Sequence, residues 1–212
     1  MRPRTHIGLA VLCALGFASA VQAAVQPGSY VGNQTELATR LELRPDGRFR
    51  YALSYGALDE RAEGRWVEEG GQLLLTTEPA PKPPRFPVVS DTPSPNGKLY
   101  ASLQNADSLG GFSLTVRVRY EGAQDFEYLE AGEDGEVPVP AGKIVAELAP
   151  DLPVYDVVPE THRLTPGGHR IVFRFEANDL GIADFRAEPL AIQGGELVLR
   201  RHDRVIRFRR GS

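Results

Sequence analysis

Sulfur is nearly absent from this chain. The only cysteine is Cys13 and the only methionine is Met1, both within the first 23 residues. Without those residues the chain has no disulfide, no thiol nucleophile and no soft sulfur ligand for a metal. Lysine is also scarce, with 3 residues against 21 arginines, and no segment after residue 23 shows convincing helical periodicity. These absences exclude thiol chemistry and point away from a helical fold.

The first 23 residues have the pattern of a secretory signal peptide. Arg2 and Arg4 precede an apolar run from Ile7 to Ala20, and Val21-Gln22-Ala23 supplies small residues for cleavage. The run of about 14 residues is too short to cross a bilayer core of about 30 Å as a helix. We therefore expect cleavage near Ala23, a mature protein that is periplasmic or secreted, and no transmembrane segment in it.

The charge of the expected mature chain argues against one class of partner. It contains 22 basic and 28 acidic residues, a net charge of −6. General affinity for nucleic acid requires a basic surface, so we expect no nucleic-acid partner. No motif indicates a bound cofactor.

Strand periodicity dominates the region from residue 28 to residue 77. In the segment 48–55, aromatic and aliphatic residues alternate with arginine, as half-buried strands do. Pro45-Asp46-Gly47 before it predicts a hairpin turn, because proline presets φ and Asp-Gly tolerates positive φ. Gly70-Gly71 predicts a later turn. The pattern predicts an antiparallel meander.

The rest of the chain divides at a proline-rich stretch. Residues 78–97 hold seven prolines and no amphipathic period, which predicts a linker or a loop that follows the edge of a sheet. Alternation resumes at 98–181 and again in a C-terminal hairpin from Glu196 to Arg210. We expect that hairpin to pair with the N-terminal meander, since this would cover an open sheet edge.

Two stretches resemble known families. Gly28-Ser29-Tyr30, the Pro45-Asp46-Gly47 turn and Gly64-Arg65-Trp66 resemble small bacterial lipocalin-like barrels and the N-terminal domain of the copper-resistance lipoproteins. The Cys-x-x-Cys motif of the latter family is missing, so no copper or redox role is carried over. Gly132-Glu133-Asp134-Gly135 and the Val137 to Pro140 strand resemble a transthyretin-like carboxypeptidase regulatory domain, whose usual role is structural or binding.

These observations predict an all-β fold. The expected organisation is a meander or small barrel (24–77 plus 182–212), the linker (78–97) and an inserted transthyretin-like β-sandwich (98–181). One continuous sandwich of two sheets is the alternative.

Two sets of residues are candidates for binding. The aromatic side chains of Tyr51, Tyr55 and Trp66 could line the mouth of a barrel and hold an apolar ligand, although small barrels also fill their cores with such residues. In the arginine-rich tail, Arg204, Arg207 and Arg209 could dock on an anionic surface or an acidic envelope protein. They could equally pair with glutamates of neighbouring strands, for which we name Glu36, Glu42 and Glu68.

The sequence gives weaker support to a metal site or a catalytic site. The segment from Asp156 through Glu160 and His162 to His169 holds metal-ligating side chains, but its His-x6-His spacing matches no compact motif, so we predict no metal site. Ser54 resembles a nucleophile elbow that has lost its first glycine, and no histidine base is placed near it. A group of carboxylates is interpreted as a solvated face: Asp59, Glu60, Glu63, Glu68 and Glu69.

The sequence therefore favours an exported, non-enzymatic β-protein that binds an envelope partner or ligand. A carrier of a small apolar ligand, and a hydrolase whose site assembles from distant loops, are the alternatives.

Overall fold

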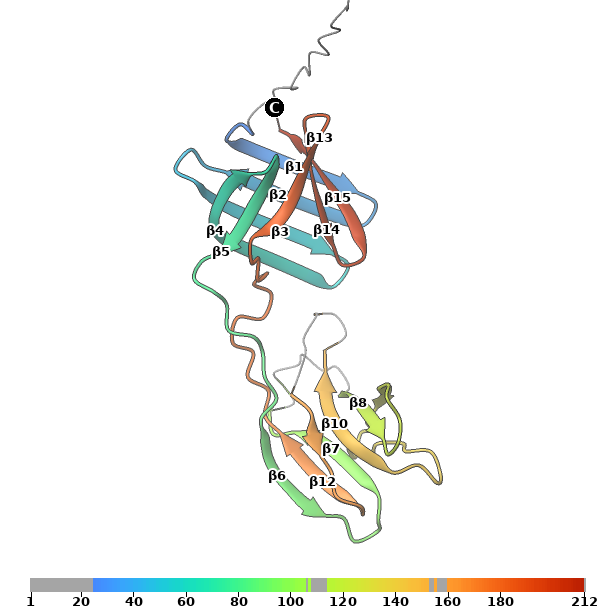
Figure 1. The fold of residues 1–212 in the computed structure, drawn as a ribbon. Coiled ribbons are helices and arrows are strands. Elements are labelled where there is room, and N and C mark those ends of the chain that lie inside the picture. The colour runs from blue at the N-terminus through green and yellow to red at the C-terminus, as the bar shows by residue number, and fades with distance from the viewer. Residues whose placement is uncertain (1–24, 106, 108–113, 153–154, 156–159, 212) are drawn as a thin grey trace, which may run out of the picture.

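The protein is built from strands (Figure 1). A computed structural model describes residues 25–105, 107, 114–152, 155 and 160–211, and these contain fifteen strands in three sheets and no helix. The predicted all-β fold is confirmed.

Eight antiparallel strands form a closed barrel. Five come from the N-terminal part and three from the C-terminal part, in the spatial order β1-β15-β14-β13-β5-β4-β3-β2. Their bounds are β1 Gly28–Gln34, β2 Leu37–Leu43, β3 Arg48–Tyr55, β4 Leu58–Glu69, β5 Gln72–Thr77, β13 Glu188–Gln193, β14 Glu196–Arg201 and β15 Arg204–Arg210. β15 pairs with β1, and β13 pairs with β5, so the C-terminal strands close the sheet that the N-terminal strands begin.

Alternation along each strand decides which side chains fill the barrel. In β3, Phe49, Tyr51 and Leu53 are buried, whereas Arg50 and Ala52 are exposed. Each fully buried large apolar side chain contributes about 1.5–3 kcal/mol relative to leaving it in water. One continuous core therefore runs along the barrel axis.

Tight turns at both ends of the barrel follow from local sequence. The predicted turn at Pro45-Asp46-Gly47 is confirmed, with Gly47 at φ 78° and the Arg48 amide donating to Asp46 Oδ1 over 3.1 Å. His202 and Asp203 connect β14 to β15 with φ values of 51° and 54°. These values are those of a type I′ hairpin turn, which needs positive φ at both central residues, and side chains other than glycine adopt it at a cost of about 1–3 kcal/mol each.

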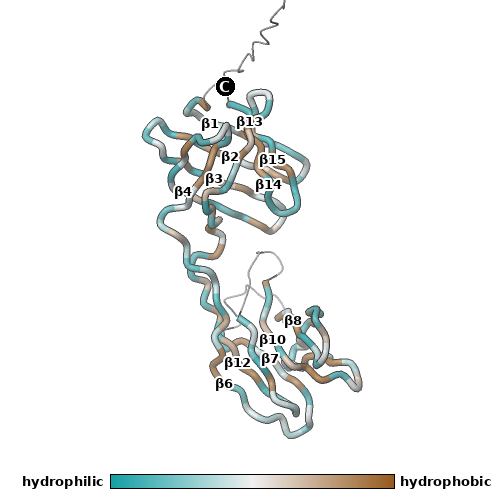
Figure 2. The backbone as a smooth tube through the Cα atoms, viewed as in Figure 1, coloured by the Kyte–Doolittle hydropathy of each residue, from teal (hydrophilic) through white to brown (hydrophobic). Residues whose placement is uncertain are grey.

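Two connecting segments, residues 78–87 and 174–187, leave the barrel side by side and form a stalk (Figures 1 and 2). Arg85 and Glu176 exchange both backbone hydrogen bonds at 2.9 Å, and the Asp179 amide donates to the Lys82 carbonyl over 3.1 Å. The returning segment also contributes to the barrel core, because Phe185 is buried there and is anchored by Thr77. The stalk is thus a paired structure joined to the barrel core.

Beyond the stalk lies a distal lobe, residues 88–173. A three-stranded sheet has the order β6-β12-β7 and a four-stranded sheet the order β11-β10-β8-β9. Their bounds are β6 Val88–Pro93, β7 Leu99–Leu103, β8 Thr115–Tyr120, β9 Glu127–Glu130, β10 Val145–Asp151, β11 His162–Arg163 and β12 His169–Phe173. Val118, Leu148 and Phe173 belong to one core shared by the two sheets.

Residues 88–93 differ from the expected linker. They form the edge strand β6, which pairs antiparallel with β12. Pro87 precedes the strand and Pro93 ends it, where a missing amide donor costs little at the edge of a sheet. The prolines therefore mark the ends of a strand rather than its absence. The transthyretin-like sandwich is not confirmed by this arrangement of sheets.

Candidate binding site: the arginine face of the barrel

Five arginines lie on the outside of the barrel around β1, and we call this surface the arginine face: Arg40, Arg44, Arg50, Arg207 and Arg209. The exposed side chains of β1 between them are uncharged. Val31 is 37% exposed and lies opposite Arg40 of β2 on one side and Arg209 of β15 on the other. Neighbouring strands lie about 4.8 Å apart, so Arg40 and Arg209 flank a narrow uncharged row.

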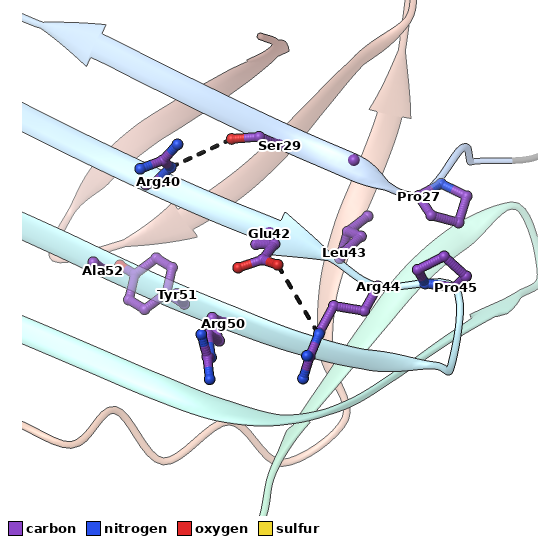
Figure 3. Close-up of a pocket in the computed structure, with 11 residues that line it drawn as sticks. Pro27, Ser29, Arg40, Glu42, Leu43, Arg44, Pro45, Arg50, Tyr51 and Ala52 are labelled. Carbon is purple, nitrogen blue, oxygen red and sulfur yellow. Dashed lines mark hydrogen bonds and ion pairs between the residues drawn. The ribbon is translucent and has the colours of Figure 1, made fainter.

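A hollow opens on this face beside β1 (Figure 3). It has a volume of about 790 Å³, and Arg40, Arg44 and Arg50 line it together with Glu42 and Ala52. Guanidinium groups present several N–H donors in one plane, which suits carboxylate and phosphate oxygens. The hollow can therefore receive an anionic group.

The carboxylates near these arginines hold them only loosely. Arg44 Nε lies 4.0 Å from Glu42 Oε1, and Arg50 Nε lies 3.9 Å from Glu63 Oε2. Exposed pairs of this kind contribute about 0–1 kcal/mol. Arg40 Nε donates to the Ser29 hydroxyl over 3.3 Å. These cations keep N–H donors for a ligand.

Two of the three arginines predicted to bind a partner lie on this face. Arg209 Nε is 2.7 Å from Glu196 Oε1, and Arg207 Nη1 is 3.6 Å from Glu196 Oε2. The hydrogen bond from Arg209 lowers the pKa of Glu196. The alternative, pairing with a glutamate of a neighbouring strand, is what the structure shows for Arg207 and Arg209, but the partner is Glu196 of β14 and not Glu36, Glu42 or Glu68. With Glu42, Glu63 and Glu196 counted, the face keeps a net charge of +2.

Arg204, the third of these arginines, serves the barrel itself. Its guanidinium lies 4.3 Å from the centre of the Tyr55 ring and donates to the Tyr55 hydroxyl. A cation over an aromatic ring is stabilised by the ring quadrupole. Arg204 is therefore held at the end of the barrel and is not part of the arginine face.

The aromatic residues predicted to bind a ligand lie at different levels of the barrel. Tyr51 is 3% exposed and points into the core, where its ring meets Phe185 at 5.0 Å. Tyr55 lies opposite Leu58 of β4, whereas Trp66 lies eight residues further along that strand and donates from Nε1 to the Arg44 carbonyl over 3.1 Å. Eight residues of strand span about 26 Å. The structure does not gather these three side chains around one cavity.

A buried polar cluster at one end of the barrel was missed from the sequence. Arg201 Nη2 lies 2.7 Å from Glu60 Oε1, and His202 Nε2 lies 3.1 Å from Glu60 Oε2. Burial acts to raise the pKa of Glu60, but the hydrogen bonds and charges of Arg201 and His202 outweigh it and lower the pKa. Burial, followed by the charge of Glu60, raises the pKa of Tyr51.

Glu60 was wrongly assigned to a solvated face. Its side chain is only 9% exposed, because Glu60 shares the inward face of β4 with Leu58 and Ala62, while Asp59 and Arg61 face outward. This placement was a signal in the sequence, since a carboxylate on the inward face of a strand requires a cation. Its two partners lie 141 and 142 residues away, in β14 and the following turn.

The histidines weighed as metal ligands converge on one carboxylate instead. His162 Nε2 lies 2.9 Å from Asp91 Oδ2, and His169 Nδ1 lies 2.8 Å from Asp91 Oδ1. Glu160 is exposed, and Asp156 lies outside the described residues. Within the part of the chain that the structure describes, no three His, Cys, Asp or Glu side chains are arranged to hold a metal ion. The cluster links β6 and β12 of one sheet to β11 of the other.

Ser54 has a carboxylate neighbour. Its hydroxyl donates to Asp59 Oδ1 over 2.6 Å on the outside of the barrel. Both residues lie in exposed positions of paired strands. This contact is an ordinary cross-strand hydrogen bond.

Comparison with protein-family models, curated proteins and solved structures found no match to the chain. The family resemblances noted in the sequence gain no support from these comparisons. Among the described residues there is no helix with the length and apolar character needed to cross a membrane.

Proposed function

We propose that this is an exported, non-enzymatic protein of the bacterial envelope that binds a partner carrying anionic groups through the arginine face. The amino-terminal sequence supports export, since its basic start, apolar run and small residues fit a cleaved signal. The observation that carries the binding role is the uncharged row of β1 between Arg40 and Arg209. An anionic group above Val31 would have cations on both sides.

Binding of this kind would be weak at each contact and cooperative over the face. The guanidinium groups of Arg44 and Arg50 are loosely paired, at 4.0 and 3.9 Å from their carboxylates, so little opposes a new ion pair there. Arg209 is held more closely, at 2.7 Å from Glu196, and a partner would share it with that carboxylate. Charge complementarity mainly raises the association rate and selects the partner. Salt should weaken binding, because the Debye length falls from about 10 Å at 0.1 M to about 3 Å at 1 M.

Photo-crosslinking in cells tests the proposal. A photoreactive residue replaces Val31, at the centre of the face, or Val67, which is 53% exposed on β4 and serves as the matched control. We expect a discrete crosslinked product from position 31 and not from position 67. Reversing the face with Arg40→Glu and Arg209→Glu should reduce the product roughly tenfold, a loss typical of charge reversal at an ionic contact.

The control for net charge is the double variant Arg163→Glu with Arg186→Glu. These side chains are 87% and 86% exposed and lie away from the arginine face. This variant should crosslink like the wild type. Equal crosslinking from positions 31 and 67, or no effect of the face variant, would contradict the binding role. Export is tested separately, by finding Ala24 as the first residue of the protein recovered from the envelope fraction.

A further inference from the structure

The distal lobe carries an unusually acidic edge. Residues 121–136 contain seven acidic residues and no basic one, and we call them the acidic edge. They surround β9, which is the outer strand of its sheet and exposes 62% of Tyr128. Two of these carboxylates pair with a lysine. Glu127 Oε1 lies 2.7 Å from Lys143 Nζ, and Glu136 Oε2 lies 2.7 Å from Lys98 Nζ.

Asp134 interacts electrostatically with Lys98. Four further carboxylates of the acidic edge form no ion pair with a basic side chain among the described residues: Glu121, Asp125, Glu130 and Glu133. The charge imbalance extends to the whole region between the barrel segments. Residues 78–181 hold 9 basic and 16 acidic residues, whereas 24–77 and 182–212 together hold 13 basic and 12 acidic residues. The chain thus has an acidic half and a barrel with a cationic face.

The two surfaces do not meet within one chain. Among the described residues, no ion pair joins the acidic edge to the arginine face, and the stalk separates the lobe from the barrel (Figure 1). Opposite charge within one molecule attracts when two molecules are aligned head to tail. A second copy of this chain is therefore a partner whose charge matches the arginine face.

We infer that the arginine face binds the acidic edge of a second copy, so that the protein associates head to tail. The inference rests on the proposed function, because it names a partner for the same face. Val31 and Tyr128 supply exposed apolar surface amid the two charged regions. Each contact uses different surfaces on its two copies, which makes it heterologous and leaves one face and one edge free for further copies.

Sedimentation velocity of the mature chain at about 100 µM tests this, since that concentration exceeds the micromolar dissociation constants of weak specific contacts. We expect species of two or more copies at 0.1 M salt and at least about tenfold weaker association at 1 M salt. The face variant is Arg40→Glu with Arg209→Glu, and the edge variant is Glu130→Arg with Glu133→Arg. Each alone should be monomeric.

Mixing the two variants is the decisive measurement. The face variant keeps an intact edge and the edge variant keeps an intact face, so the mixture should form a one-to-one heterodimer that grows no further. The Arg163→Glu and Arg186→Glu variant should associate like the wild type. Emission from Trp66 confirms that the barrel of each variant is folded.

A monomeric wild type, or a mixture that stays monomeric, would overturn head-to-tail association. If Val31 still crosslinks to a different protein in that case, the proposed function stands and only this inference fails. If the face variant changes neither crosslinking nor sedimentation, both are wrong. Assembly of the edge variant alone to the wild-type extent would also overturn the inference.

Discussion

Raising the pH from 5.5 to 8.5 should destabilise the distal lobe through His169. Its Nδ1 faces Asp91 Oδ1 at 2.8 Å, and its Nε2 faces the carbonyl oxygen of Thr165 at 2.9 Å. Both partners are acceptors, so both ring nitrogens must carry a proton and the ring is an imidazolium. Burial acts to lower the pKa of His169, but the hydrogen bonds to Asp91 and Thr165 and the charge of Asp91 together raise it.

The direction of the pH effect follows from these pKa values. Because the pKa of His169 is raised above its ordinary 6.5, its stabilisation is complete below pH 6.5 and is lost as the pH rises through the raised value. Burial acts to raise the pKa of Asp91, but hydrogen bonds and charge from His162 and His169 lower it below 3.8. Its stabilisation is complete above pH 3.8 and is lost as the pH falls through the lowered value. The cluster therefore stabilises the lobe most between pH 3.8 and 6.5.

The size of the effect can be estimated from the contacts. Hydrogen bonds to charged groups contribute about 1.5–3 kcal/mol, and the lower value applies because the Asp91 side chain is 23% exposed. For a lobe of about 86 residues, a loss of about 1.5 kcal/mol corresponds to roughly 6–12 °C in Tm. Calorimetry of the whole protein should show this decrease in the transition of the distal lobe. Trp66, the only tryptophan, follows the barrel transition separately.

The matched variant is Asp91→Asn, which removes the charge and keeps the size of the side chain. It should have a lower Tm at pH 5.5 and a much flatter dependence of Tm on pH. If Asp91→Asn keeps the wild-type slope between pH 5.5 and 8.5, the imidazolium is not the source of the pH effect and the reasoning is refuted.

Three further predictions concern the barrel, each measured by urea unfolding with Trp66 emission. Phe185→Ala should lower the free energy of unfolding by about 3–5 kcal/mol, because it removes a fully buried ring that the stalk contributes to the barrel core. A small loss would show that this ring is not part of the core. Glu60→Gln should cost about 3 kcal/mol by leaving Arg201 without its carboxylate. Glu196 is more accessible, with 24% of its side chain exposed, so Glu196→Gln should barely change the midpoint, and equal losses would contradict this. Tyr51→Phe should change the free energy of unfolding by less than about 1 kcal/mol, because the buried hydroxyl has no hydrogen-bond partner among the described residues. A large loss would show that the hydroxyl does have a partner.

Local pattern made the class of fold and several turns predictable. Alternation of Phe49, Tyr51 and Leu53 with polar neighbours identified a strand and its inward side. Pro45-Asp46-Gly47 identified the hairpin before it. These features depend on residues a few positions apart, so the sequence contains the information directly.

The site and the clusters depend on contacts between distant residues. Arg207 and Arg209 could be recognised as a basic stripe, but Arg40 joins them only because β1 pairs with both β2 and β15. Asp91 meets His169 through the register of β6 and β12, 78 residues apart. Period-2 alternation indicates the face of a strand and says nothing of its neighbour, so these pairings required the structure.

Closure of the barrel sets an order of events during biosynthesis. Val31 and Arg209 are hydrogen-bonded neighbours across 178 residues of chain, so the barrel stays open until the final strand has left the ribosome. The distal lobe is complete well before then, and strands β1 to β5 wait with two unpaired edges. Such long-range pairing folds slowly. Until the last strand arrives, the free edges of β1 and β5 can pair with another chain, so the period before closure is when the barrel is most open to misassembly.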